Sequence, residues 1–97
     1  MQRQPAIYLL SNKPGGVLYT GVTSNLPGRV WQHRARVAKG FTAKYNLKTL
    51  VYFELFDEMY AAIAREKQIK SGSRQAKIRL IESVNPTWRD LYADICG

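Results

Sequence analysis

The sequence predicts a mixed α/β chain of the α+β kind, in which a small three-stranded sheet is flanked by helices. Short β-rich runs at residues 6–10, 17–22 and 47–56 give the strands. Other stretches repeat apolar residues at helical spacing and begin or end at a capping or helix-breaking residue. The 97 residues have the size of one domain, so we assign residues 1–97 to a single folded unit.

The first two strands are expected to form a hairpin, because a Pro-Gly-Gly run at 14–16 breaks the chain between them. Each strand carries one tyrosine. If Tyr8 pairs directly with Tyr19, both rings lie on one face of the sheet and residues 12–15 form the loop. Gly21 ends the second strand and lets the backbone turn sharply or approach a ligand closely.

The first helix is expected to begin after Asn25, whose side chain can cap it, with Pro27 in the first turn. Arg29 and His33 are four residues apart and are therefore neighbours on the helix surface. Gly40 closes the helix or its trailing turn. A narrow apolar stripe and a second arginine lie on the same side of this helix: Leu26, Val30, Val37 and Arg36.

The stretch before the third strand, residues 41–45, is expected to be a connecting loop with exposed basic and aromatic character. The strand at 47–56 is apolar on both faces, which favours a central strand covered on each side. One face holds Leu47, Val51, Phe53 and Leu55, and the other holds Leu50, Tyr52 and Phe56.

The second helix is expected to run from residue 57 or 58 to residue 71, with Met59, Ala62, Ile63 and Ile69 as its apolar stripe. Glu66 falls in the middle of that stripe. A carboxylate at a core-facing position is costly unless it has a partner, and a metal ion or an arginine would serve.

The last part of the chain is expected to hold a third helix, capped by Ser73 and stopped at residues 85–86. Beyond it, four apolar or aromatic side chains pack the tail back onto the core: Trp88, Leu91, Tyr92 and Ile95.

The charge of the chain is lopsided, with 15 Lys and Arg against 7 Asp and Glu and a net charge of +8. Such a charge attracts polyanions, and nucleic acid is the first candidate because neutralised phosphates release counterions. A solubilising surface would also explain the charge. A membrane surface is a weaker candidate, because the sequence shows no basic amphipathic helix with flanking aromatic residues.

The single cysteine, Cys96, excludes an intrachain disulfide and a thiolate zinc site, and it favours a reduced, cytoplasmic setting. No leader segment precedes the first strand, and no apolar run approaches the length of a membrane span. A cytoplasmic location without a membrane partner is therefore expected.

Taken alone, each candidate residue has a structural explanation. The tyrosines favour strands and Arg29 can be a solvated helix residue. His33 can be a hydrogen-bonded core residue, and Glu66 can belong to a buried ion pair. Together they match phosphodiester hydrolysis, which needs a base for water and a cation near the phosphate. Arginine offers a charged fork suited to phosphate, and one carboxylate suffices for Mg²⁺. Arginine and Mg²⁺ nearby would lower the tyrosine pKa from about 10, and histidine can take a proton at neutral pH.

These residues resemble the motifs of the GIY-YIG endonuclease superfamily, and nearly the whole chain is covered by the likeness. The first motif matches residues 6–8 and the second matches residues 19–21, followed by Arg29 and His33. The acid of the second helix matches Glu66, and the segment 85–91 is similar to the close of the small stand-alone bacterial branch. Two residues depart from the motifs: Ala6 replaces the glycine of the first motif, and Thr20 replaces the isoleucine of the second.

The resemblance implies a three-stranded antiparallel sheet flanked by helices and cleavage of DNA dependent on Mg²⁺ or Mn²⁺. By the same likeness, Tyr8 and Tyr19 would sit at the scissile phosphate, one acting as or supporting the base. Arg29 would stabilise phosphate charge, His33 would assist proton movement and Glu66 would bind the metal. Gly21 and Asn85 would support the site.

The expected function is a metal-dependent endonuclease in DNA repair or recombination, acting on branched or damaged DNA. The basic residues after the first helix, Arg36, Lys39 and Lys44, would bind nucleic acid, with Lys48 beside them. The same cluster leaves open a non-catalytic nucleic-acid-binding module. A third alternative is an accessory subunit of a repair complex, with a protein partner that supplies specificity.

Overall fold

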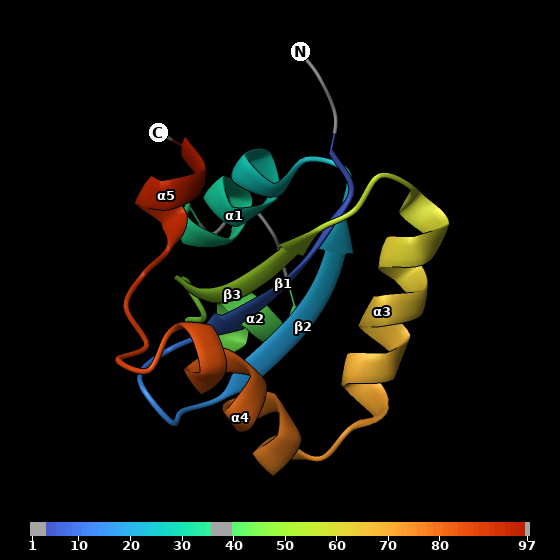
Figure 1. Ribbon diagram of the computed structural model, residues 1–97. Coiled ribbons are helices and arrows are strands. Elements are labelled where there is room, and N and C mark those ends of the chain that lie inside the picture. The colour runs from blue at the N-terminus through green and yellow to red at the C-terminus, as the bar shows by residue number, and fades with distance from the viewer. Residues whose placement is uncertain (1–3, 36–39, 97) are drawn as a thin grey trace.

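The computed structural model describes residues 4–35 and 40–96. A three-stranded antiparallel sheet is flanked by helices on both faces, as the sequence predicts (Figure 1). In chain order the elements are β1 (Ala6–Ser11), β2 (Leu18–Thr23), α1 (Leu26–Arg34), α2 (Phe41–Lys44), β3 (Thr49–Leu55), α3 (Met59–Ser71), α4 (Arg74–Val84) and α5 (Tyr92–Cys96).

The strand order is β2-β1-β3, so β1 is the central strand and the prediction that the third strand is central is wrong. Every residue of β1 is buried, whereas Leu55 of β3 is 56% exposed. Helices cover both faces of the sheet, so an edge strand here is apolar on both faces too. The apolar pattern of β3 therefore indicates that helices cover both faces of the strand, but it does not indicate whether the strand is central or at an edge.

The predicted pairing of Tyr8 with Tyr19 is also wrong, because Tyr8 pairs with Gly21 and Tyr19 pairs with Leu10. The shift is two residues, so both tyrosines still share one face. Gly21 lies inside β2 and does not end it. The loop runs over residues 12–17, where the Asn12 side-chain oxygen accepts a hydrogen bond from the Val17 amide at 3.0 Å.

A bulge interrupts the ladder between β1 and β3, since Leu9 pairs with Tyr52 while Leu10 pairs with Leu50. The extra residue, Val51, changes the alternation of β3. Leu50 and Phe53 consequently pack in one core cluster, and the predicted alternation that separated them is wrong.

Helix α1 begins as predicted, because the Asn25 side chain accepts a hydrogen bond from the Gly28 amide at 3.2 Å. It ends at Arg34, before the predicted close at Gly40. Gly40, with a φ of 97°, instead precedes α2, so the prediction of a loop at residues 41–45 is wrong. The predicted stripe residue Val37 lies outside the described residues.

Two core clusters lie on opposite faces of the sheet. Tyr8, Leu10 and Val30 belong to the cluster on the side of α1 and α5, and Ile7, Ala62 and Ile81 belong to the cluster under α3 and α4. Figure 1 shows α3 running beside the sheet next to β2, with α1 and α5 together at its other side.

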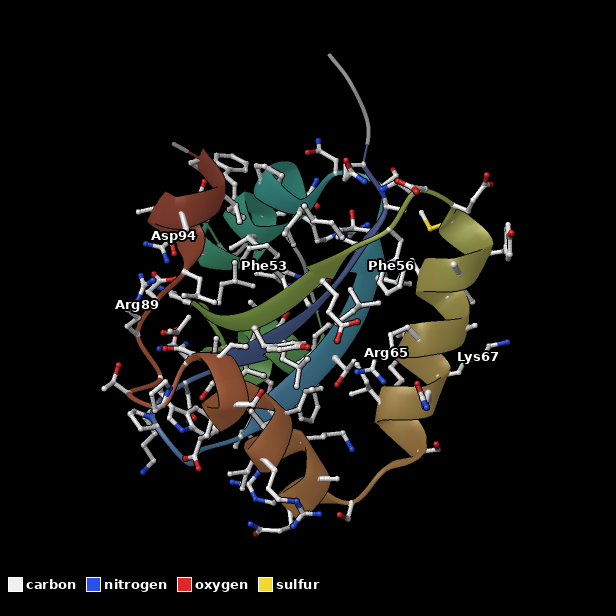
Figure 2. The ribbon with its side chains drawn as sticks, viewed as in Figure 1. Phe53, Phe56, Arg65, Lys67, Arg89 and Asp94 are labelled. Carbon is white, nitrogen blue, oxygen red and sulfur yellow. The ribbon has the colours of Figure 1, made fainter. Side chains whose placement is uncertain are left out.

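Helices α3 and α4 follow their predicted ranges closely, and Ser73 caps α4 by accepting a hydrogen bond from the Ala76 amide. On α3, Arg65 points toward the sheet while Lys67 points into solvent (Figure 2). The tail packs back as predicted, with Trp88 and Leu91 buried, and it adds the short helix α5. Among the described helices, none has the length and apolar character needed to cross a lipid bilayer.

Candidate active site

A hydrogen-bonded chain of three side chains joins β1, α1 and α2. The Tyr8 hydroxyl lies 3.2 Å from His33 Nε2, and His33 Nδ1 lies 2.8 Å from the Thr42 hydroxyl. All three side chains are buried. Because neutral histidine has one donor and one acceptor nitrogen, a proton on Nδ1 leaves Nε2 free to accept the Tyr8 proton.

Tyr8 fits this position because Gly21 lies opposite it on the outer strand. A Cβ atom on Gly21 would lie 2.4 Å from Tyr8 Cζ and 2.5 Å from its hydroxyl oxygen. The tyrosine hydroxyl therefore rests directly over the β2 backbone, at a place where any side chain would displace it.

Tyr19 completes a triangle of rings on the same face. The ring centres of Tyr8 and Tyr19 are 6.1 Å apart, and those of Tyr19 and His33 are 5.8 Å apart. Tyr19 is only partly buried, so this triangle has an inner member, Tyr8, and an outer one. The shift of two residues in the hairpin register produces this arrangement.

Arg29 lies one helical turn before His33 and is exposed. It lines a polar hollow at the junction of β2 and α1, together with Thr23, Ser24, Asn25, Gly28 and Gln32. An arginine at the edge of such a hollow is suited to a phosphate group.

The pKa shifts of Tyr8 and His33 both favour the neutral form of the side chain at pH 7. Burial raises the pKa of Tyr8, the charges of Tyr19 and Glu66 add to the rise, and the charge of Arg29 opposes it. The charge of Arg29 acts in the expected direction, but burial outweighs it, so the pKa of Tyr8 lies above its usual value. Burial, followed by the charge of Arg29, lowers the pKa of His33 below 6.5.

Glu66 comes from α3, on the other side of the sheet, yet its charge acts on Tyr8. Its side chain is 13% exposed and forms an ion pair with Lys70 at 2.8 Å. The sequence led us to expect a metal ion or an arginine beside this carboxylate. The side chain that pairs with it is a lysine, and the neighbouring Arg65 pairs with Glu54.

The side chains near Glu66 limit which metal ion this carboxylate could hold. Among the described residues, no group of three or more His, Cys, Asp or Glu side chains could hold a metal ion. Mg²⁺ keeps several waters and needs only one or two carboxylates, so Glu66 with water and a substrate phosphate fits it.

The remaining predicted residues lie in different surroundings. Arg36 and Lys39 lie outside the described residues. Lys44 is exposed, with its ammonium 5.4 Å from the centre of the Tyr45 ring. Asn85 is buried and bonds the backbone of Val51 at 3.0 Å, so it fastens β3 to the segment after α4.

Sequence reasoning missed the contribution of α2, which supplies Thr42 to His33 and stacks Phe41 on Tyr19 with ring centres 6.3 Å apart. Neither residue belongs to the motifs used above. The aromatic and basic character of residues 41–45 was the available signal, but only the fold brings that segment back onto α1.

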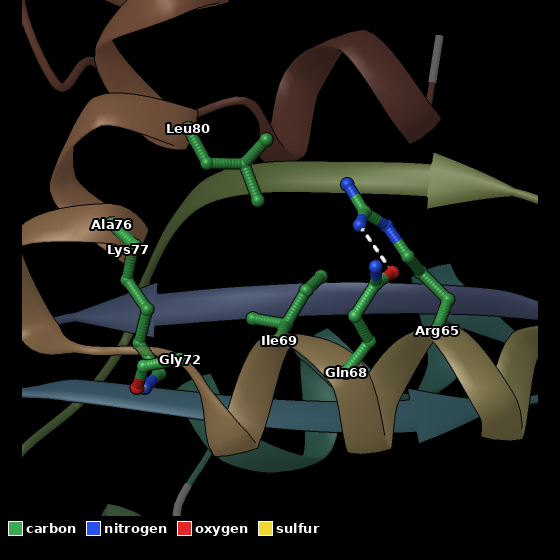
Figure 3. A pocket seen from close by; sticks show the side chains of 7 residues that line it. All are labelled: Arg65, Gln68, Ile69, Gly72, Ala76, Lys77 and Leu80. Carbon is green, nitrogen blue, oxygen red and sulfur yellow. Dashed lines mark hydrogen bonds between the residues drawn. The ribbon is translucent and has the colours of Figure 1, made fainter.

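A separate hollow between α3 and α4 lies on the opposite face of the sheet (Figure 3). Its two cations are already engaged, since Arg65 bonds Gln68 at 2.7 Å and Lys77 bonds the Gly72 carbonyl at 2.7 Å. Ile69 and Leu80 place it over the second core cluster, away from Tyr8. It is therefore no part of the candidate active site.

Comparison with known proteins finds a matching family and similar proteins. A family model described as "GIY-YIG catalytic domain" matches residues 4–79, a range that includes Tyr8, Glu66 and the residues assembled between them but not Asn85. A UPF0213 protein of Staphylococcus haemolyticus is 37% identical over 76 residues, which cover 78% of this chain and 92% of that protein. A UPF0213 protein of Haloquadratum walsbyi is 42% identical over 65 residues, which cover 67% of this chain and 73% of that protein.

The fold has a counterpart among solved structures. The solution NMR structure of a UPF0213 protein from Bacillus halodurans is similar with a TM-score of 0.57 and 23% sequence identity. The likeness covers 90% of this chain and 92% of that one, and it supports the fold alone.

Proposed function

Since this chain belongs to the GIY-YIG family, we propose that it is a metal-dependent endonuclease that hydrolyses DNA phosphodiester bonds. The observation that carries the proposal is the 3.2 Å contact between the Tyr8 hydroxyl and His33 Nε2, beside Tyr19. A buried tyrosine in contact with a neutral histidine forms a route along which a proton can leave attacking water.

The proton route runs through Tyr8 to His33. As water attacks the phosphorus, its proton passes to the Tyr8 oxygen while the Tyr8 proton passes to His33 Nε2. The P–O bond to the leaving sugar oxygen breaks in the same step, and that oxygen takes its proton from solvent. Tyr8 ends the step as it began, and His33 becomes the charged group. The raised pKa of Tyr8 supports such a coupled transfer, because a free phenolate would be scarce at neutral pH.

Three residues would serve the phosphate. Arg29 would neutralise negative charge on it from the polar hollow at the start of α1. Tyr19, the outer ring of the triangle, would orient the phosphate or the water against Tyr8. Glu66 would hold Mg²⁺ or Mn²⁺, which supplies Lewis-acid stabilisation of the charged oxygens when bound.

We propose branched or damaged DNA as the substrate, in repair or recombination, and the basic residues Arg36, Lys39 and Lys44 as residues that bind it. The net charge of +8 supports a polyanionic partner. Asn85 would act at a distance, by holding the edge strand β3 in place. A protein partner would add specificity without altering these roles.

The test is cleavage of supercoiled plasmid and synthetic branched DNA in Mg²⁺, in Mn²⁺ and in EDTA. We expect cleavage with either metal and none in EDTA. Glu66→Gln and Arg29→Ala should each lower the rate by about 10²–10³-fold, as loss of an electrostatic group in a transition state does.

Two exposed residues provide matched controls for these losses of charge. Glu58→Gln changes the same residue type at the start of α3, where the side chain makes no capping bond, and Arg79→Ala removes an arginine from α4. Both should cleave at the parent rate. DNA binding without cleavage of any substrate would contradict the proposal and favour a non-catalytic binding module.

A further inference from the structure

Two aromatic rings extend the active-site face outward. Phe41 stacks on Tyr19 with an interplanar angle of 29°, and Tyr45 packs against Phe41 with ring centres 4.7 Å apart. Phe41 is 48% exposed and Tyr45 is 40% exposed. The row therefore begins at a ring of the proposed active site and ends in solvent.

The core does not require these two rings. Neither Phe41 nor Tyr45 is among the residues of the buried clusters or the partly buried hydrophobics packed against them. Thr42, between them, points inward to His33 and anchors the short helix α2. Helix α2 thus places Thr42 inside the site, while Phe41 of the helix and Tyr45 at its C-cap present aromatic rings outside.

A cation accompanies the rings. The Lys44 ammonium lies 5.4 Å from the centre of the Tyr45 ring, and no acidic side chain forms an ion pair with it within the described residues. An aromatic surface beside a positive charge is the combination that binds a nucleobase and its phosphate. The continuity with Tyr19 favours nucleic acid over a peptide as the occupant.

We propose that Phe41 and Tyr45 form a stacking platform for an unpaired nucleobase next to the phosphate that is cut. This inference rests on the proposed nuclease function and names its substrate class. In a duplex the base faces are covered by their neighbours, so exposed rings cannot stack on them. The platform therefore selects single strands, flaps, gaps or bulges over continuous duplex.

The test is equilibrium binding in EDTA, where cleavage does not interfere. Fluorescence anisotropy would compare a labelled thymidine oligonucleotide of about 12 nucleotides, within the usual site size, with a duplex of equal length. We expect Phe41→Ala and Tyr45→Ala each to weaken single-strand binding about 5- to 150-fold, the fold-change that loss of one stacked base produces. Duplex binding should stay within about twofold, because phosphate contacts provide it.

Two control variants and a stability measurement separate stacking from folding and from general surface loss. Phe41→Leu keeps apolar bulk without an aromatic face and should lose binding as Phe41→Ala does. Tyr60→Ala removes a ring that is 73% exposed on α3 and should leave binding unchanged. Tyr45→Ala spares the contact with Tyr19, and thermal unfolding of each variant shows whether the fold survives.

The outcomes separate this inference from the nuclease proposal. Equal losses on single strand and duplex, or no loss in either, would overturn the platform even if the protein cuts DNA. Selective loss on the single strand would establish the platform even if no cleavage is found.

Discussion

Tyr8 and Gly21 form the pair on which the active-site geometry depends. The tyrosine is 2% exposed and lies over the glycine of the neighbouring strand. Its hydroxyl reaches His33 only because Gly21 has no side chain. The glycine is therefore a positioning residue, and its role is steric.

Gly21→Ala should displace the Tyr8 ring, because the new Cβ would lie 2.4 Å from Cζ. We expect a loss of about 1–3 kcal/mol in the free energy of unfolding, the usual cost of overpacking, and a loss of cleavage. Urea unfolding measures the first quantity. In a Tyr8→Ala background the same substitution should cost less, and additive effects in this double-mutant cycle would contradict the steric account.

Thr42 should fix the tautomer of His33, because its hydroxyl lies 2.8 Å from Nδ1. The chain has one histidine, so ¹⁵N NMR of the imidazole reports this ring alone. We expect a protonated Nδ1 in the parent and in Thr42→Ser, and a mixture of tautomers in Thr42→Val. Cleavage by Thr42→Val should fall by about 10-fold or more, as with other partners that orient a histidine. Retention of the parent spectrum in Thr42→Val would contradict this role.

Stability should depend on pH through His33, whose pKa is held below 6.5 by burial and then by Arg29. The unfolded chain then binds more protons than the folded one at mildly acidic pH. The free energy of unfolding should therefore fall as the pH drops below 6.5 and level off below the folded pKa. Urea unfolding between neutral and acidic pH checks this, and His33→Gln should remove the dependence near pH 6.5. A titration of His33 above 6.5 would reverse the sign.

At the scale of elements, helix α3 brings a metal-ligand candidate to the site and a lysine that competes for it. Lys70 pairs with Glu66 at 2.8 Å, although the Lys70 side chain is 51% exposed. Water screens the half-exposed lysine end of this pair, so the pair is weak and the proposed divalent ion would replace the lysine.

Lys70→Ala should therefore tighten Mn²⁺ binding by about 2- to 5-fold, the value of a weak surface ion pair. Calorimetric titration measures the affinity without DNA. Lys67→Ala, which removes a lysine that points into solvent from the same helix, is the matched control and should change little (Figure 2). Weaker binding in Lys70→Ala would mean that the lysine orients Glu66 and does not compete for it.

The capped starts of α1 and α4 were more predictable than the pairing of the strands. Asn25 and Ser73 cap α1 and α4 as expected, because capping is a local property of a few residues. The hairpin register depends on how Tyr8 and Gly21 pack across strands, and the bulge at Val51 depends on both core clusters. These long-range effects leave no local pattern.

The candidate site divides in the same way. Tyr8, His33 and Glu66 were identifiable from residue type and spacing. The contribution of α2 was not identifiable in this way. Thr42 belongs to none of the motifs, and it contacts His33 only in the folded chain. The rise in the Tyr8 pKa also follows from burial in the folded chain, which outweighs the nearby arginine.

For the whole molecule, the fold holds two sets of groups together from opposite sides of one sheet. Helices α1 and α2 supply His33 and Thr42 on one face, and α3 supplies Glu66 from the other, next to the edge strand β2. A net charge of +8 would attract the proposed polyanionic substrate to the molecule. The mixed α+β fold is thus what brings these residues, distant in sequence, into the one site that we propose.

The most direct test of the central claim is the rate of Mg²⁺-dependent DNA cleavage by Tyr8→Phe compared with Tyr52→Phe. Both substitutions remove the hydroxyl of a buried tyrosine, but the Tyr52 hydroxyl bonds Glu54 on the other face of the sheet. We expect Tyr8→Phe to lower the rate by about 10²–10⁴-fold, the range for a general base, and Tyr52→Phe to stay within about twofold. Cleavage by Tyr8→Phe at the parent rate, or equal losses in both variants, would contradict the proton route through Tyr8 and His33.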